Sequence, residues 1–171
     1  GTTTYAAGGS GLFMKKVGSA DWTRPKIVSP NGFCPNLSDI AYIDGTIYVS
    51  GTYDYLAKST DDGATWTEMY TVTSLFDAIY GMSWFDADNG ILVGELNRDD
   101  VIYKTTDGGA TRTTIQHNVV GGQFNSVHFA QGQNRIGVIC GDEEPVADDQ
   151  RFYYTVDGGD SWSLAYDTLA P

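Results

Sequence analysis

The sequence predicts an all-β protein made of four consecutive copies of one four-stranded antiparallel unit, with the first copy incomplete. Three observations support this. A turn motif recurs three times, at intervals of 46 and 50 residues. Alternating strand patterns flank each copy of the motif. The 171 residues include 21 glycines and 11 tyrosines, a content typical of short strands joined by tight turns.

The recurring motif is Ser/Thr-x-Asp-x-Gly-x-x-Trp. It covers 59–66, 105–112 and 155–162, and Arg112 replaces the tryptophan in the second copy. A short carboxylate can accept backbone N–H groups inside a turn, glycine permits positive φ, and tryptophan covers the hairpin with a large apolar face. The candidate structural residues are Ser59, Asp61, Gly63 and Trp66; Thr105, Asp107 and Gly109; and Thr155, Asp157, Gly159 and Trp162.

Four strands, A to D, are expected in each complete unit, with the motif as the C–D turn. They are 38–43, 46–51, 55–58 and 66–71; then 79–85, 90–95, 101–104 and 113–117; then 126–130, 135–141, 151–154 and 162–166. Four-stranded antiparallel units at this spacing are the blades of a β-propeller. The sequence therefore predicts a propeller of about four blades.

The first unit begins at strand B. Residues 5–8 match 48–51, and Lys15 matches Lys58, both at an offset of 43. Strand C is then expected at 12–17 and strand D at 23–28, with no strand A. The predicted division is a partial blade 1 at 1–30, blade 2 at 31–73, blade 3 at 74–119 and blade 4 at 120–171.

These repeats resemble the Asp-box, or BNR, repeats of sialidase-type and photosystem II assembly-factor-like propellers. The stretch 124–129, followed by the motif at 155–162, is similar to the repeat of the second group. The resemblance covers nearly the whole chain. It implies that the turns are structural and lie away from the ligand-binding face.

A missing inner strand would expose unpaired backbone N–H and C=O groups, which proteins normally cover. Three arrangements would cover them. A neighbouring subunit can supply the strand, making an oligomer or filament. The chain can be a fragment of a longer propeller with further blades. The N-terminal segment can also close a four-bladed ring unaided.

The charge limits the classes of partner. The 22 acidic and 10 basic residues give a formal net charge of −12, which repels phosphate backbones, so nucleic acid is not an expected partner. No apolar run approaches the roughly 18 residues of a membrane span. An acidic surface fits a secreted protein, and we expect an extracellular protein whose partner is a second copy of itself or a glycan.

Loops B–C and D–A share one face of such a propeller, and that face is the candidate ligand site. Candidates for stacking on sugar rings are Tyr53, Tyr55 and Phe76, and candidates for bonding sugar hydroxyls are Asn97, Arg98 and Asp99. The alternative interpretation is that these tyrosines simply occupy strand ends at the surface.

Two further candidates lie on or near this face. A weak calcium candidate is the acidic loop with Asp142, Glu143, Glu144, Asp148 and Asp149. It lacks the ordered alternation of an EF-hand, so a solvated acidic loop is the alternative and no cofactor is expected. Cys34 and Cys140 could form a disulfide between blades 1 and 4 of a closed ring, or remain two separate thiols.

The sequence predicts no catalytic site. Sialidase chemistry needs a cluster of arginines around a carboxylate, but Arg112 lies in a turn on the opposite face and Arg98 alone is clearly in a ligand-face loop. His117 and His128 have no serine or cysteine partner at a telling spacing. We expect a non-enzymatic structural or assembly subunit, with a glycan- or protein-binding module and a fragment of a sialidase-like enzyme as alternatives.

Overall fold

The computed structural model describes residues 2–24, 27, 32–70, 77–117, 123–130, 135–142 and 150–167. The only regular secondary structure in these ranges is β-strand. The strands are β1 (Thr3–Gly8), β2 (Leu12–Val17), β3 (Leu37–Ile43), β4 (Thr46–Gly51), β5 (Tyr55–Ser59), β6 (Thr67–Tyr70), β7 (Ala78–Trp84), β8 (Gly90–Leu96), β9 (Asp99–Thr105), β10 (Thr113–Ile115), β11 (Gln123–Phe129), β12 (Gly137–Asp142), β13 (Gln150–Thr155) and β14 (Ser163–Asp167). Within the same ranges, no helix is long and apolar enough to cross a membrane.

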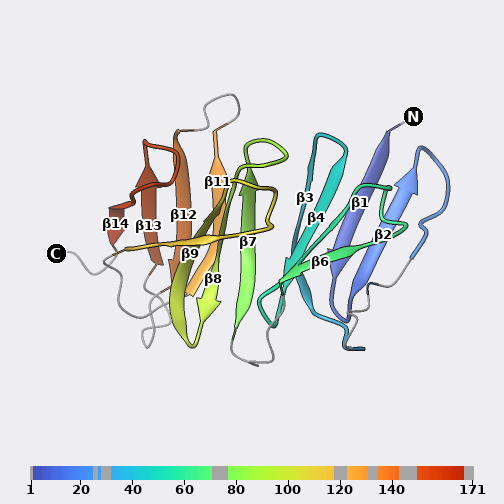
Figure 1. The fold of residues 1–171 in the computed structure, drawn as a ribbon, viewed down its shortest axis with the longest axis horizontal. Helices are drawn as coiled ribbons and strands as arrows, with labels where there is room; N and C mark the ends of the chain where they lie inside the picture. The colour runs from blue at the N-terminus through green and yellow to red at the C-terminus, as the bar shows by residue number, and fades with distance from the viewer. Residues whose placement is uncertain are drawn as a thin grey trace.

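The strands form four antiparallel sheets in chain order. Blade 1 is the hairpin β1–β2, blade 2 is β3 to β6, blade 3 is β7 to β10 and blade 4 is β11 to β14. Each complete sheet is a simple meander in which consecutive strands pair. The blades stand side by side along the long axis of the molecule, from the blue β1–β2 hairpin to the red β14 (Figure 1). The predicted all-β propeller of about four blades is thus confirmed.

The apolar core is divided among three interfaces between blades. The first joins Phe13 of blade 1 to Ile47 and Val49 of blade 2. The second joins Tyr48 and Leu56 of blade 2 to residues of blade 3, including Leu92. The third joins Ile91, Val93 and Ile102 of blade 3 to residues of blade 4, including Phe124 and Ile139. Because side chains alternate along a strand, each middle blade contributes one set of residues to the interface before it and another to the interface after it.

Strand contacts confirm which strand is missing from blade 1. The inner strands β3, β7 and β11 pack against one another in succession. Each also contacts the second strand of the preceding blade, β7 against β4 and β11 against β8. Strand β1 contacts β3 in that same second position. Strand β1 is therefore strand B of its blade, and the position of strand A beside it is empty among the described residues.

Two expectations about blade 1 are corrected. The strand D expected at 23–28 is reduced, in its described part, to one isolated bridge between Lys15 and Thr23; Pro25, Lys26 and Val28 lie outside the described residues. The described blades also do not close into a ring by themselves, because blades 1 and 4 lie at opposite ends of the row (Figure 1). Closure would need the two end blades to meet.

The candidate disulfide fails for the same reason. Cys34 lies before β3, and its side chain is near Gly11 of blade 1. Cys140 lies in β12 of blade 4. Both cysteines are half-buried free thiols. The alternative of two separate thiols holds.

Candidate functional site

The three repeated turns, at 59–66, 105–112 and 155–162, have the same internal hydrogen bonds. In the first, the Ser59 hydroxyl donates to Asp61 Oδ1 at 2.8 Å and accepts the Gly63 N–H at 2.8 Å. Asp61 also accepts the Thr65 N–H at 2.8 Å and the Thr65 hydroxyl at 2.6 Å. The hydroxyl and backbone N–H of Thr65 lower the pKa of Asp61 to about 2. The other two turns repeat these bonds around Asp107 and Asp157. The carboxylates serve the turn itself, as the sequence predicts.

The glycine at the fifth position of each turn packs against the preceding blade. Gly63, Gly109 and Gly159 have φ values of 82°, 85° and 84°, in the left-handed region that favours glycine. A Cβ at Gly63 would lie 2.4 Å from the Phe13 ring, and one at Gly159 would lie 2.7 Å from Ile91 Cδ1. Each turn is therefore also part of an interface between blades.

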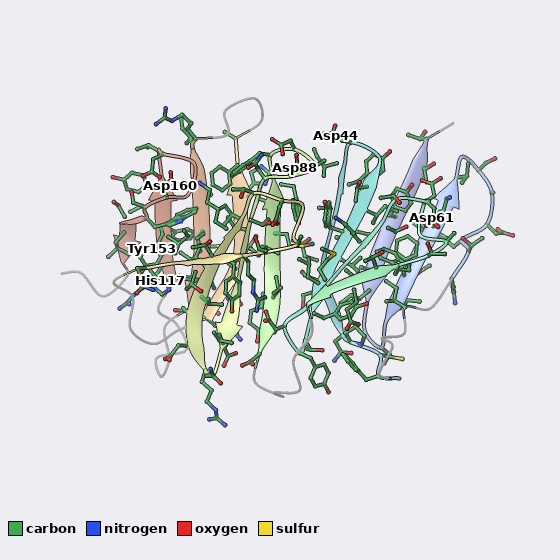
Figure 2. All side chains as sticks on the ribbon, in the orientation of Figure 1. Asp44, Asp61, Asp88, His117, Tyr153 and Asp160 are labelled. Carbon is green, nitrogen blue, oxygen red and sulfur yellow. The ribbon has the colours of Figure 1, made fainter. Side chains whose placement is uncertain are left out.

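A lysine on strand C of each of the first three blades binds the turn of the next blade. Lys15 Nζ lies 3.0 Å from Asp62 Oδ2. Lys58 Nζ donates to the Gly108 carbonyl at 3.2 Å. Lys104 Nζ donates to the Gly158 carbonyl at 3.1 Å and to Asp160 at 2.6 Å. Asp160 lies in the upper half of the molecule, as do Asp44 and Asp88 of the β3–β4 and β7–β8 turns (Figure 2).

Arg112 takes a role that the sequence did not predict. Trp66 packs edge-on against Phe13, with 5.0 Å between ring centroids. Arg112, in the equivalent place, reaches back to blade 2, where its guanidinium binds both carboxylate oxygens of the buried Asp54. Its Cζ also lies 3.9 Å from the centroid of the Tyr103 ring. Burial raises the pKa of Asp54, and the Arg112 guanidinium opposes that shift. The pair links the β4–β5 turn to the repeated turn of blade 3.

A second buried aspartate lies between blades 3 and 4. Asp100 accepts the Phe124 N–H at 2.8 Å, and the Nε2 of His117 lies 3.1 Å from the Asp100 carbonyl. Burial, with a smaller contribution from Glu95 and Asp99, raises the pKa of Asp100 to about 6. The repeat could have indicated this residue. Asp54 and Asp100 are 46 residues apart, and each immediately precedes the buried part of strand C in its blade.

The predicted sugar-binding residues are not gathered into one site. Tyr55 is only 1% exposed, so the prediction that it stacks on a ligand is wrong. Tyr53 packs edge-on against Phe33 in the β4–β5 region of blade 2. Asn97, Arg98 and Asp99 are exposed around the β8–β9 turn of blade 3. Phe76 lies outside the described residues.

The acidic loop is only partly described. Asp142 ends β12 and accepts a hydrogen bond from Asn125 Nδ2 at 3.0 Å. Glu143, Glu144, Asp148 and Asp149 lie outside the described residues. Among the residues that the structure does describe, no group of three or more His, Cys, Asp or Glu side chains is placed to hold a metal ion.

In the part of the chain that the structure describes, the edge of β1 away from β2 has no paired strand, and we call it the free edge of β1. The Thr2 carbonyl accepts the Gly18 N–H at 2.8 Å, so even-numbered residues of β1 direct their backbone groups toward β2. By the same alternation, Thr3, Tyr5 and Ala7 direct their N–H and C=O groups toward the empty inner position. In blade 2 the equivalent edge of β4 pairs with β3.

A glycine lies at or near the end of strand B in every blade, and at three of the four glycines a close backbone atom explains it. A Cβ would lie 2.1 Å from the Asn36 carbonyl oxygen at Gly51, 1.9 Å from that of Ala78 at Gly94, and 2.4 Å from that of Gln123 at Gly141. In each case the close atom belongs to the start of the inner strand or the residue before it. At Gly8 the nearest atom is a side-chain carbon of Leu12, at 3.8 Å. Among the described residues, no inner strand lies beside Gly8.

Comparison with known proteins supports the architecture. No family model and no curated protein sequence matches the chain. Among solved structures, it is similar to "YCF48 bound to D1 peptide" (TM-score 0.56, 10% identity, 94% of this chain and 76% of that one). It is also similar to YCF48 from Cyanidioschyzon merolae (TM-score 0.56, 12% identity, 95% and 68%).

Larger proteins match as well. They include the GH74 enzyme of Niastella koreensis (TM-score 0.66, 18% identity, 90% of this chain and 25% of that one). The GH74 xyloglucanase of Xanthomonas campestris is similar too (TM-score 0.67, 14% identity, 96% and 28%). The chain spans about a quarter of these two enzymes. At such identities the likeness shows the fold alone, and that fold is the β-propeller.

Proposed function

We propose that this chain is a non-enzymatic assembly module that binds an extended strand of another polypeptide along the free edge of β1. The strand would take the position of strand A and complete blade 1. Adding a strand to an exposed sheet edge is a general mode of peptide recognition, in which main-chain hydrogen bonds provide much of the affinity. The observation that carries the proposal is Gly8, which is open where Gly51, Gly94 and Gly141 are covered by an inner strand.

The other blades indicate what kind of strand would fit. Each inner strand runs antiparallel to strand B and has an irregular register near the strand-B glycine, as between Leu37 and Asp39. Each places an aromatic residue near its far end: Tyr42, Trp84 or Phe129. The incoming segment would therefore be extended, would cross Gly8 with its backbone close, and would end in an aromatic residue opposite Thr4.

One comparison gives this proposal a precedent. A solved structure with a similar fold is of YCF48 bound to D1 peptide, so a propeller of this shape binds a peptide in that protein. A glycan-binding role on the loop face has less support here, because Tyr55 is buried and the other described candidates are divided between two blades.

The proposal is tested with a peptide copying residues 77–85 of this chain, which contain inner strand β7. Fluorescence anisotropy of the labelled peptide should show saturable binding to the wild-type protein. Gly8→Ala should abolish it, because the new Cβ would meet the backbone of the incoming strand. The free protein should fold normally, since that Cβ meets only Leu12.

The matched control is Thr4→Val, a change of similar size on the same strand at a residue whose backbone groups face β2. It should bind the peptide as the wild type does. Equal binding by Gly8→Ala and wild type would overturn the proposal, as would failure of the wild type to bind this peptide and one copying residues 123–130.

A further inference from the structure

The outward side of blade 4 has the residue pattern of an interface between blades, but most of its described side chains are exposed. We call it the rear face of blade 4; its described members are Ile136, Val138, Cys140, Phe152, Tyr154 and Val156. Val138 is 51% exposed, whereas Tyr48 and Ile91 at the same sheet position are 1% and 0% exposed. The strand pairing shows that these three positions are equivalent. Val138 lies opposite Tyr154, just as Tyr48 lies opposite Lys58 and Ile91 lies opposite Lys104.

The interior blades show what normally covers this face. Tyr48 stacks on Trp84 of the next blade, with 3.8 Å between ring centroids, and its hydroxyl donates to the Ala87 carbonyl at 3.0 Å. Ile91 is covered by Gly159, in the repeated turn of blade 4. The natural occupant of a rear face is therefore the front face of another blade.

Blade 1 has a front face of the matching kind, which is partly exposed. That face carries Thr4, Ala6, Leu12, Met14 and Lys16, paired across β1 and β2. The equivalent positions in blade 2 include Ile47, Val49 and Ala57, all 0% exposed. Leu12 is 38% exposed. Each end of the row of blades thus presents one half of an interface that is formed three times inside the chain.

Two departures from the repeat also match each other. In the interior, a strand-C lysine of one blade binds the repeated turn of the next. Blade 4 has Tyr154 in the place of that lysine, and blade 1 has a shorter turn, at 18–22, in the place of the repeated turn. The blade without the lysine and the blade without its acceptor are the two end blades.

We infer that the rear face of blade 4 binds the front face of blade 1 of a second copy of this chain, head to tail. The contact is heterologous, so it leads to closed rings or open filaments according to the angle between copies. This inference goes beyond the proposed function and does not depend on it, since the inner-strand position of blade 1 lies at the edge of the sheet rather than on its front face.

The test is sedimentation velocity of the purified chain over a range of concentrations. The wild type should form species larger than a monomer that grow with concentration. Tyr154→Glu, on the rear face, and Met14→Glu, on the front face, should each be monomeric. Leu164→Glu is the matched control, because Leu164 is 48% exposed in the same blade but lies opposite Tyr153, on the other side of the sheet.

A mixture separates a head-to-tail contact from a symmetric one. Tyr154→Glu keeps an intact front face and Met14→Glu keeps an intact rear face, so an equimolar mixture should form dimers and nothing larger. A wild type that stays monomeric at every concentration would overturn the inference. So would Tyr154→Glu and Leu164→Glu having the same effect on assembly, or a mixture of the two face variants that remains monomeric. Peptide binding at β1 is measured separately and should survive Tyr154→Glu.

Discussion

The interface between blades 2 and 3 and the interface between blades 3 and 4 use the same sequence position in different ways. Asp54 and Asp100 are 46 residues apart and are both nearly buried. Asp54 is paired with an arginine from the next blade, whereas the carboxylate of Asp100 accepts the Phe124 N–H and lies near charges of both signs. The repeated sequence places an aspartate at this position in both blades, but the residues of the adjoining blade determine which groups bind its carboxylate.

The largest expected effect is at the Asp54–Arg112 pair. Arg112→Ala would leave Asp54, which is 1% exposed, without its guanidinium partner. Removing one member of a buried ion pair costs about 3–5 kcal/mol of unfolding free energy. The loss should shrink at low pH, because protonation of Asp54 removes the buried charge. Urea denaturation at several pH values measures both effects.

The control for this variant is Arg24→Ala, which removes an exposed arginine from the segment after β2. Exposed substitutions usually change stability by no more than about 0.5 kcal/mol. If Arg112→Ala were as stable as Arg24→Ala, the pair would not hold blades 2 and 3 together. The double variant Asp54→Asn/Arg112→Ala should recover part of the loss.

The repeated turns allow a second comparison of the two interfaces. Gly109→Ala and Gly159→Ala both force alanine into left-handed backbone, which costs about 1–2 kcal/mol. Gly159→Ala should cost more, because its Cβ would lie 2.7 Å from Ile91 whereas that of Gly109 would lie 3.1 Å from Leu56. Thermal unfolding of the two variants, side by side, measures the difference. Equal losses would mean that blades 3 and 4 are not packed more tightly at this point.

The effect of Asp100 on stability should be visible through its pH dependence. Its pKa is about 6 in the folded chain against an ordinary value of 3.8, so the protonated form is favoured by folding. That contribution is fully present below pH 3.8 and is lost as the pH rises through about 6. In the wild type, this loss lowers the free energy of unfolding by about 1–3 kcal/mol over this pH range, and Asp100→Asn should abolish that fall.

The check is the difference in unfolding free energy between wild type and Asp100→Asn at each pH. The carboxylates of the repeated turns have the opposite pH dependence, in a lower pH range. The pKa of Asp61 is lowered to about 2, so its contribution to stability is lost as the pH falls through that value. A difference between wild type and variant that stays constant from pH 4 to pH 6 would contradict the prediction.

The features repeated in the sequence could be predicted, and the contacts between repeats could not. The turns around Asp61, Asp107 and Asp157 are local, so their residues alone indicated their structure. The empty strand A of blade 1 followed from the match between 5–8 and 48–51. The partner of Arg112, however, is 58 residues away in another blade. The sequence predicts Tyr55 at the surface, but its side chain is buried in the cluster that blades 1 and 2 share.

The division of the core into three separate clusters has a consequence for how the molecule comes apart. An end blade belongs to one cluster, whereas blades 2 and 3 each belong to two. In a linear array where each unit touches only its neighbours, stability is close to a sum over units and interfaces. Unfolding of blade 1 or blade 4 therefore disrupts a single interface and leaves the remaining two intact. Unfolding should fray inward from both ends, with the sheet of β7 to β10 among the last to exchange its amide hydrogens.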